Sequence, residues 1–305
     1  MLQEALQKYN GDVFLYFGEI SRSGYDQFSD ILVERENPKD NACLILCTYG
    51  GNPDAGYRMT RALRHHYGKL DILVPDVCKS AGTLMCIGAN RLIIGDRGEL
   101  GPLDIQIAKP DEMFESMSGL ELIQAMSAMK NQMLVAFRQY LVDIRQGSRI
   151  KTKMAADIAT KLAEGFISPI AAKIDPVTLG EHQRAMQIGF EYGTRLNEMA
   201  ESLKSEALDK LVSDYPAHGF VIDRKEASSL FKVVDKPSDD TVLLYEWIKG
   251  IISKRGMPDG QPLVVDLQDI AGKSSENNES EPKKPKAKRA ARKASKKSSR
   301  GKSDD

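Results

Sequence analysis

The stretch VCKSAGTLMCIGANRLIIGDRGELGPLD, residues 77–104, joins the end of an apolar strand, a short polar turn, an apolar helix and a second strand. Such strand–helix–strand units are typical of parallel sheets that helices cover on both faces. The turn places the hydroxyl of Ser80 where a strand passes into a helix. Ser80 is therefore either an ordinary helix N-cap or a side chain displayed at the carboxyl end of a strand.

The same alternation extends through the first hundred residues. Strands are predicted for DVFLYFGEI, ACLILCTYGG, KLDILVPDV and NRLIIGD, and helices for GYDQFSDILVER and for the segment from Pro53 to about Tyr67. This pattern predicts an α/β core, residues 1–110, with a parallel sheet flanked by helices. The segments TYGGNPDAG and VCKSAGT both follow strands, where the sites of such sheets gather.

After about Met113 the pattern becomes helical. Long Met-rich segments, continuing through TLGEHQRAMQIGFEYGTRLNEMAESLKSEALDKLV, predict a helical C-terminal lobe over residues 111–272, with HGFVIDRKEA as a segment that returns to the site. These helices are apolar enough to need a partner surface, either the sheet or a second subunit. Residues 273–305 contain no aromatic residue and no aliphatic one larger than alanine, so a disordered basic tail is expected there.

Charge and composition exclude several classes of protein. From Lys273 onward there are 12 Lys/Arg and 5 Asp/Glu, so the totals of 43 each leave 31 and 38 in the rest of the chain, which is mildly acidic. No apolar run approaches the roughly 20 residues of a membrane span, and the first residues do not have the pattern of a secretory signal. The four cysteines lie in apolar stretches and are expected as buried, reduced thiols, which predicts a cytoplasmic protein.

Acyl transfer is the chemistry that fits two such turns. It needs a hydroxyl at an exposed turn and backbone N–H groups that face the oxygen of the tetrahedral intermediate. The N–H of Gly51, with Gly50 as a possible second donor, and the N–H of Ala81 could supply an oxyanion hole. The alternative is that Ser80 only caps its helix and that the glycine pair is a plain turn. No motif for ATP, zinc or NAD occurs, so no cofactor and no metal are expected.

The order of these segments resembles the ClpP/crotonase superfamily, and within it the membrane-peptidase branch of SppA and NfeD peptidases and the serine dehydrogenase proteinase family. The resemblance is carried by TYGGNPDAG, SAGT, LGPLDIQ, KIDPVTLGEHQRAMQIGFEYG and HGFVIDRKEA, and it covers roughly Asp12 to Asp235. It implies Ser80 as the nucleophile, with Gly51 and Ala81 as oxyanion donors. It also implies a ClpP/crotonase-like fold and a homo-oligomer, either trimer-based or a ring.

The resemblance leaves the general base open. ClpP peptidases take a histidine from the segment matching GPLDIQ and an aspartate from the segment matching HGFVIDRKEA. Here the first segment has Asp104 and the second has His218, so the two roles are exchanged in a Ser80–His218–Asp104 triad. The rival is a Ser–Lys dyad of the SppA/NfeD kind, in which Lys130, among methionines on a predicted helix, would be the base.

Three functions are compatible with these residues. The first is a serine endopeptidase that cleaves unfolded or extended polypeptides without ATP of its own. The others are a crotonase-like enzyme acting on acyl-CoA, and a catalytically inactive scaffold with the same fold. The three histidines His65, His66 and His182 are interpreted as surface or packing residues. The tail, residues 273–305, is either a solubilising segment or a site of weak contact with nucleic acid or another polyanion.

Overall fold

The core of the protein is a six-stranded sheet with the strand order β10-β1-β2-β3-β5-β9. All neighbouring strands are parallel except the edge strand β10, which runs antiparallel to β1. The computed structural model describes residues 1–103, 106–108, 116–256, 258 and 260–272. The strands of this sheet are β1 (Asp12–Phe17), β2 (Asn41–Cys47), β3 (Lys69–Val74), β5 (Arg91–Ile94), β9 (Val234–Asp235) and β10 (Leu263–Asp266).

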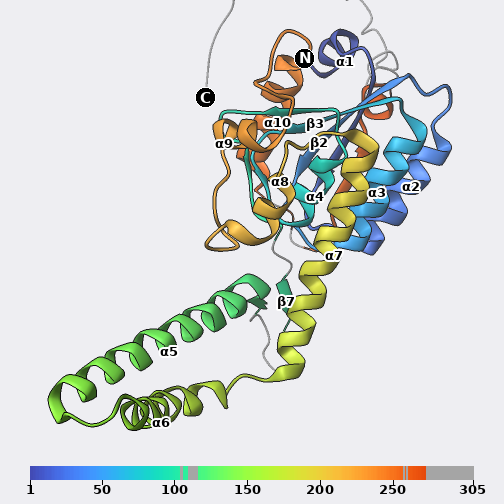
Figure 1. Cartoon of the computed structure of the whole chain (residues 1–305). Coiled ribbons are helices and arrows are strands. Elements are labelled where there is room, and N and C mark those ends of the chain that lie inside the picture. The colour runs from blue at the N-terminus through green and yellow to red at the C-terminus, as the bar shows by residue number, and fades with distance from the viewer. Residues whose placement is uncertain (104–105, 109–115, 257, 259, 273–305) are drawn as a thin grey trace, which may run out of the picture.

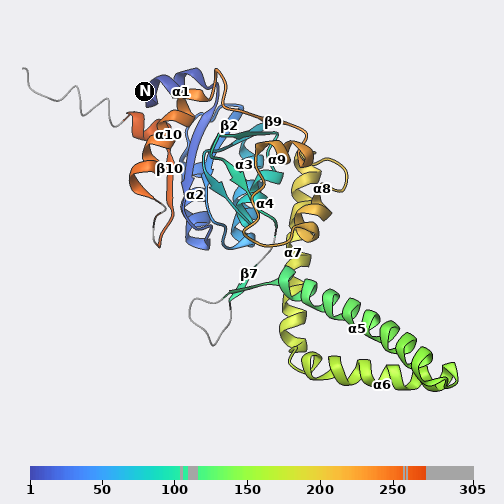
Figure 2. The same ribbon diagram turned by 90° about the vertical axis from the view of Figure 1, so that its left-hand side faces the viewer.

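Both faces of the sheet are buried, which explains why its strands are apolar at successive positions. Alternate residues of β1, such as Phe14 and Leu15, lie in two separate hydrophobic clusters. One face is covered by α2 (Arg22–Glu34), α3 (Pro53–His66) and α4 (Ala81–Ile87), and the other by α1 (Leu2–Lys8) and α10 (Val242–Arg255) (Figure 2). The fold class predicted from the strand–helix alternation is thereby confirmed.

The helices next to the site begin at defined capping residues. The Ser21 hydroxyl accepts a hydrogen bond from the N–H of Gly24 at the start of α2. Asn52 caps α3 by accepting from the N–H of Ala55 at 3.0 Å, and Pro53 occupies the first helical position. Such caps satisfy amide groups that have no partner inside the helix. The helix α3 therefore starts directly after the glycine pair.

A helical arm projects away from the sheet (Figures 1 and 2). It consists of α5 (Gly119–Ser148) and α6 (Thr152–Ala171), and α7 (Pro176–Ala200) leads from the arm back to the body, where it contacts α3 and α4. The helical run predicted to continue beyond α7 is interrupted. Glu201 ends α7 in a left-handed conformation. In the rest of the predicted helical run, the helical elements are α8 (Ala207–Asp209) and a π-helical turn, η1 (Lys210–Asp214).

The chain after α7 returns to the body. β9 and β10 form the two edges of the central sheet, so the division predicted at residue 110 separates strands of one sheet. Strand β10 and helix α1 were not predicted. The smaller elements are β4 (Val77–Cys78), β6 (Glu99–Leu100), β7 (Gln106–Ala108), β8 (Ser116–Ser118) and α9 (Arg224–Leu230). The predicted basic tail, residues 273–305, lies outside the described residues.

No helix in the described part of the chain is both long and apolar enough to cross a lipid bilayer. Among the same residues there is no group of three or more His, Cys, Asp or Glu side chains that could hold a metal ion. The four cysteines are buried, and none of them forms a disulfide.

Candidate active site

Ser80 lies at the sharp turn between β4 and α4, in a backbone conformation that residues with a side chain rarely adopt. Its φ is +48° and its ψ is −113°. Such conformations cost about 1–3 kcal/mol and persist where the surroundings hold them in place. The Ser80 side chain makes no capping hydrogen bond to the helix that it precedes. An ordinary N-cap role therefore does not account for this serine.

Hydrogen bonds to Thr48 hold the strand before the turn. The N–H of Thr48 donates to the carbonyl of Val77 at 2.9 Å, and the N–H of Lys79 donates to the carbonyl of Thr48 at 3.0 Å. After the turn, the N–H of Gly82 donates back to Lys79 at 2.8 Å, which closes the bend. Strand β4 is thus fixed beside the end of β2, and the serine follows at the carboxyl end of both.

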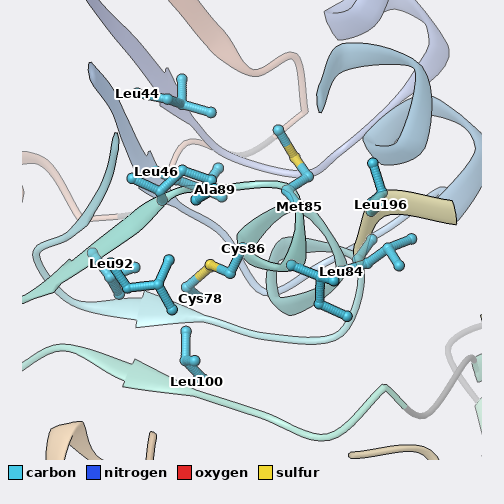
Figure 3. Close-up of a cluster of buried hydrophobic side chains, with 14 of the residues drawn as sticks. Leu44, Leu46, Cys78, Leu84, Met85, Cys86, Ala89, Leu92, Leu100 and Leu196 are labelled. Carbon is cyan, nitrogen blue, oxygen red and sulfur yellow. The ribbon is translucent and has the colours of Figure 1, made fainter. Parts of the chain in front are cut away.

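Buried apolar side chains of α4 and of the strand before the turn pack in one cluster (Figure 3). Cys78, Leu84, Met85, Cys86 and Leu100 belong to the core cluster that α4 shares with the sheet. Burial raises the pKa of the Cys78 thiol well above its ordinary value, with a further contribution from the hydrogen bond to Cys86. Cys78, two residues before the serine, therefore packs in the core and is not a reactive nucleophile.

The glycine pair lies against Ser80. Gly50 and Gly51 have φ values of +112° and +131°, which side chains disfavour. A Cβ atom built on Gly50 would lie 2.9 Å from the Cβ and 3.4 Å from the Oγ of Ser80. The turn is held by Ile20, whose N–H donates to Gly50 and whose carbonyl accepts from Asn52, both at 2.8 Å. The two turns that the sequence singled out thus meet.

The two backbone N–H groups of the glycine pair differ in their hydrogen bonding. The N–H of Gly50 donates to the buried hydroxyl of Thr48 at 3.0 Å. Across the residues that the structure describes, neither the N–H of Gly51 nor that of Ala81 has a hydrogen-bond acceptor. Gly50 therefore supplies close approach and not a donor. The amides of Gly51, in the glycine turn that packs against Ser80, and of Ala81, directly after the serine, have no described acceptor.

His218 lies on the segment that returns to this site. The carbonyl of Phe220 accepts from the Lys79 ammonium at 3.1 Å, and Ile222 pairs with Leu100 through two hydrogen bonds of 2.9 and 3.0 Å. These contacts bring the chain around half-buried His218 next to the residue before the serine. Asp104 lies outside the described residues, just after Leu103, whose N–H donates to the carbonyl of Leu211 at 2.8 Å.

The two lysines near these motifs differ in their placement. Lys79 is buried and directs its ammonium away from the serine, toward the carbonyls of Leu100 and Phe220 and the Glu99 carboxylate at 2.8 Å. Lys130 is exposed on α5, which extends away from the sheet (Figure 1). The methionines beside it, which were expected to desolvate it, are themselves partly exposed within one chain.

Three supporting residues were not singled out in the sequence. They are Thr48, Lys79 and Thr83. The Thr83 hydroxyl donates to the Cys78 carbonyl and accepts from the N–H of Gly101, both at 3.2 Å. Thr48 and Thr83 are close in sequence to the glycine pair and the serine, and this closeness is the signal that could have identified them. The partners of Lys79 are too distant in sequence to be inferred.

The protein is a mixed α/β protein with a largely parallel sheet flanked by helices and a strained serine at a strand–helix turn. Residues 26–167, somewhat less than half of the chain, match the family model described as ClpP-like SDH-type serine proteinase. The match confirms the resemblance to the serine dehydrogenase proteinase family that the two turns predicted. It supports a serine peptidase in general terms.

Two curated relatives are uncharacterized proteins of Methanocaldococcus jannaschii. MJ0137 is 34% identical over 76 residues, 25% of this chain and 27% of its own length. MJ1495 is 32% identical over 66 residues, 22% of this chain and 23% of its own length. The chain thus spans about a quarter of the relatives that it matches.

Solved structures with a partial likeness are also proteases. Two are mutants of the 1510-N membrane-bound stomatin-specific protease, one of them in complex with a substrate peptide. Each has 18% identity, a TM-score of 0.31 and coverage of 48% of this chain, and they are covered over 68% and 64% of their own length. A ClpP1 mutant from Listeria monocytogenes has 14% identity, a TM-score of 0.25 and coverage of 51% of this chain and 81% of its own. At these scores the likeness carries no conclusion about the site.

Proposed function

We propose that this protein is a serine endopeptidase that hydrolyses extended or unfolded polypeptides through an acyl-enzyme on Ser80. One observation carries the proposal: a strained serine packs against the glycine turn, and neither the N–H of Gly51 in that turn nor the N–H of Ala81 has a described acceptor. Acyl transfer needs both parts, because the hydroxyl attacks the carbonyl and the amides stabilise the oxygen that becomes negative. The family match over residues 26–167 points to the same chemistry.

The proposed reaction follows from these positions. The Ser80 Oγ attacks the scissile carbonyl while its proton passes to a general base. The resulting oxyanion accepts hydrogen bonds from the N–H groups of Gly51 and Ala81. The base then protonates the leaving amine, the C–N bond breaks and an ester remains on Ser80. Water, deprotonated by the same base, hydrolyses the ester and restores the serine.

His218, oriented by Asp104, is the proposed base. The contact between Phe220 and Lys79 supports it, because it brings the His218 segment to the residue before the serine. Lys130 is the alternative. A lysine must be desolvated to act as a base near neutral pH, and Lys130 is exposed within one chain. It could therefore serve only where another subunit covers α5.

An extended polypeptide is the proposed substrate. The glycine pair has no side chains, so a peptide backbone can lie against it and present a carbonyl to Ser80. The absence of a nucleotide-binding motif in the sequence favours hydrolysis that needs no ATP from this chain.

The arm supports a homo-oligomer as the active form. Helix α6 turns a stripe of alanines inward, Ala155, Ala159 and Ala163, while larger apolar side chains at four-residue spacing face outward. These exposed residues are Met154, Ile158, Leu162, Phe166 and Ile170. A helix that directs its large side chains to solvent is suited to bury them against a second copy. Light scattering after size exclusion would test this, since a monomer at micromolar concentration would contradict it.

Labelling by a fluorophosphonate, read by intact-protein mass, tests the nucleophile. Ser80→Ala should abolish labelling and lower peptide hydrolysis by up to ~10⁶-fold, whereas Ser168→Ala, at an exposed position on α6, should leave both unchanged. Labelling of the Ser80→Ala protein at the wild-type rate would remove this serine as the nucleophile. A correctly folded wild-type protein that neither labels nor hydrolyses peptides would instead favour the inactive scaffold.

The base is tested by the same assay. His218→Gln should slow labelling by orders of magnitude, and Lys130→Met should behave like Lys161→Met, a matched change at an exposed lysine on α6. Selective loss in Lys130→Met would transfer the base role to that lysine.

A further inference from the structure

A cationic pocket of about 530 Å³ lies between α2, α3 and α7, outside the contacts that define the Ser80 turn. Its charged lining consists of Arg58, Arg61 and Arg195 with His65 and His66 at the same surface. Of the residues that the structure describes, no Asp or Glu side chain lines it. These histidines, interpreted from the sequence as surface or packing residues, therefore share one hollow with three arginines.

The charge is concentrated by the spacing of α3. Arg58, Arg61 and His65 are three, four and seven residues apart, so they stand on one face of the helix. Basic residues in the last turn of a helix are explained by the helix dipole, which accounts for His65 and His66. It does not account for Arg58 and Arg61, which lie further toward the N-terminus, in a body with seven more acidic than basic residues.

Carboxylates compensate only part of this charge. Arg195 approaches Glu191 at 4.0 Å, and Arg22, next to the pocket, pairs with Asp26 at 3.0 Å. Neither Arg58 nor Arg61 takes part in an ion pair among the residues that the structure describes. Asp54 lines a neighbouring hollow with Arg58, but among the described residues neither guanidinium group has a carboxylate within ion-pair distance.

Aromatic rings hold this surface in place. The Arg58 guanidinium lies 5.8 Å from the centroid of the Tyr25 ring. Tyr57 of α3 stacks on Tyr192 of α7, with ring centroids 4.3 Å apart and planes 6° from parallel. The Tyr192 hydroxyl also donates to the Asp54 carboxylate at 2.8 Å. The helices carrying the arginines are therefore joined by side-chain contacts, so less conformational freedom is lost when a ligand binds.

We propose that this pocket binds a ligand with two or more closely spaced phosphate groups. Guanidinium groups match phosphate oxygens in paired hydrogen bonds, and several of them converge where multiple charges must be neutralised together. The volume lies within the range of small-ligand sites. A free polyphosphate or nucleotide and the backbone of a single-stranded nucleic acid share this chemistry. The inference does not depend on the role of Ser80.

Titration calorimetry on the full chain tests the proposal with four probes: inorganic tripolyphosphate, ATP, a twelve-residue thymidine oligonucleotide and pentaglutamate. The double variant Arg58→Ala/Arg61→Ala should weaken tripolyphosphate binding at least tenfold, as expected for the loss of charge-assisted hydrogen bonds. The matched control, Arg138→Ala/Arg184→Ala, removes the same charge from exposed positions outside the pocket and should bind like the wild type. Circular dichroism and melting temperature show that both variants are folded.

The four probes separate the sources of phosphate. Arginine-dependent binding of tripolyphosphate and ATP identifies a small-molecule site, and arginine-dependent binding of the oligonucleotide alone identifies a nucleic-acid backbone. Either result supports a phosphate site. Equal weakening in both double variants would assign binding to overall charge or to the basic tail and overturn the proposal. Pentaglutamate binding as tight as that of tripolyphosphate, or no binding of any probe at millimolar concentration, would also overturn it.

Discussion

Replacing Gly50 by alanine tests the geometry of the site most directly. The new Cβ would lie 2.9 Å from the Cβ of Ser80 and 3.2 Å from the carbonyl oxygen of Lys79. Both neighbours belong to a turn that hydrogen bonds to Thr48 hold in place. Neither can move without disturbing the strained serine, so the overlap has no flexible side chain to absorb it.

The magnitude follows from two separate costs. Gly50 has a φ of +112°, and a residue with a side chain in such a region costs about 1–3 kcal/mol. Forcing an extra carbon into a filled site costs about 1–3 kcal/mol more. We therefore expect Gly50→Ala to lower the free energy of unfolding by about 2–6 kcal/mol, a large part of the 5–15 kcal/mol typical of folded proteins.

Urea unfolding followed by circular dichroism measures this change, and fluorophosphonate labelling of the folded protein reports on Ser80. The matched control is Gly250→Ala. Gly250 lies within α10, nothing is within 4 Å of its added Cβ, and alanine there should stabilise the helix by about 0.5–1 kcal/mol. The two glycine substitutions should thus shift the unfolding midpoint in opposite directions. A Gly50→Ala protein as stable as the wild type would refute the contact between the two turns.

Three further substitutions address the charged groups of the body. Lys79→Met leaves Glu99 without its ion pair and removes the ammonium donor of the Phe220 carbonyl, while the Leu100 carbonyl keeps its hydrogen bond from the N–H of Ile222. A loss of about 1–3 kcal/mol is expected in urea unfolding, and a loss below 0.5 kcal/mol would contradict the anchoring role. Arg35→Met removes the guanidinium that pairs at 2.6 Å with the fully buried carboxylate of Asp12, and about 3 kcal/mol should be lost. Burial raises the pKa of Asp240, but the hydrogen bond and the positive charge of Arg91 lower it more, so the pKa lies below its ordinary value. The stability that the ionised Asp240 contributes is present above the pKa of Asp240 in the unfolded chain and is lost as the pH falls through its pKa in the folded protein. Asp240→Asn should therefore lose less stability than the wild type between pH 5 and 3. Identical pH profiles of the two proteins would argue against this contribution.

The alternation of strands and helices could be predicted because a parallel sheet buried on both faces needs apolar residues at successive positions. Leu44 and Ile45, for example, face opposite sides of β2 and are both fully buried. The edge strand β10 was missed for the opposite reason. It has only four residues, and its pairing with β1 joins parts of the chain about 250 residues apart, which local pattern does not report.

The positions of the two turns could also be predicted, but their conformations could not. The φ of Ser80 depends on Thr48, which holds the preceding strand, and on Gly50, which leaves room for the serine. The anchoring of Lys79 depends on Phe220, 141 residues further along the chain. A sequence motif names the residues of a turn, whereas tertiary contacts decide which amides stay free and where neighbouring side chains point.

The hydrogen bond from Gly50 to Thr48 decides which amide of the glycine pair remains as a donor in the proposed site. Because the Thr48 hydroxyl accepts from the N–H of Gly50, the donor that remains on this turn is the next amide, Gly51. The first amide of any helix has no partner inside the helix, so the N–H of Ala81 would be free at an ordinary cap too. What an ordinary cap does not require is a strained serine packed against a glycine turn that carries a second amide without a described acceptor. We propose that the strain is retained because all three groups act on one carbonyl, whose carbon meets the hydroxyl while its oxygen meets the amides.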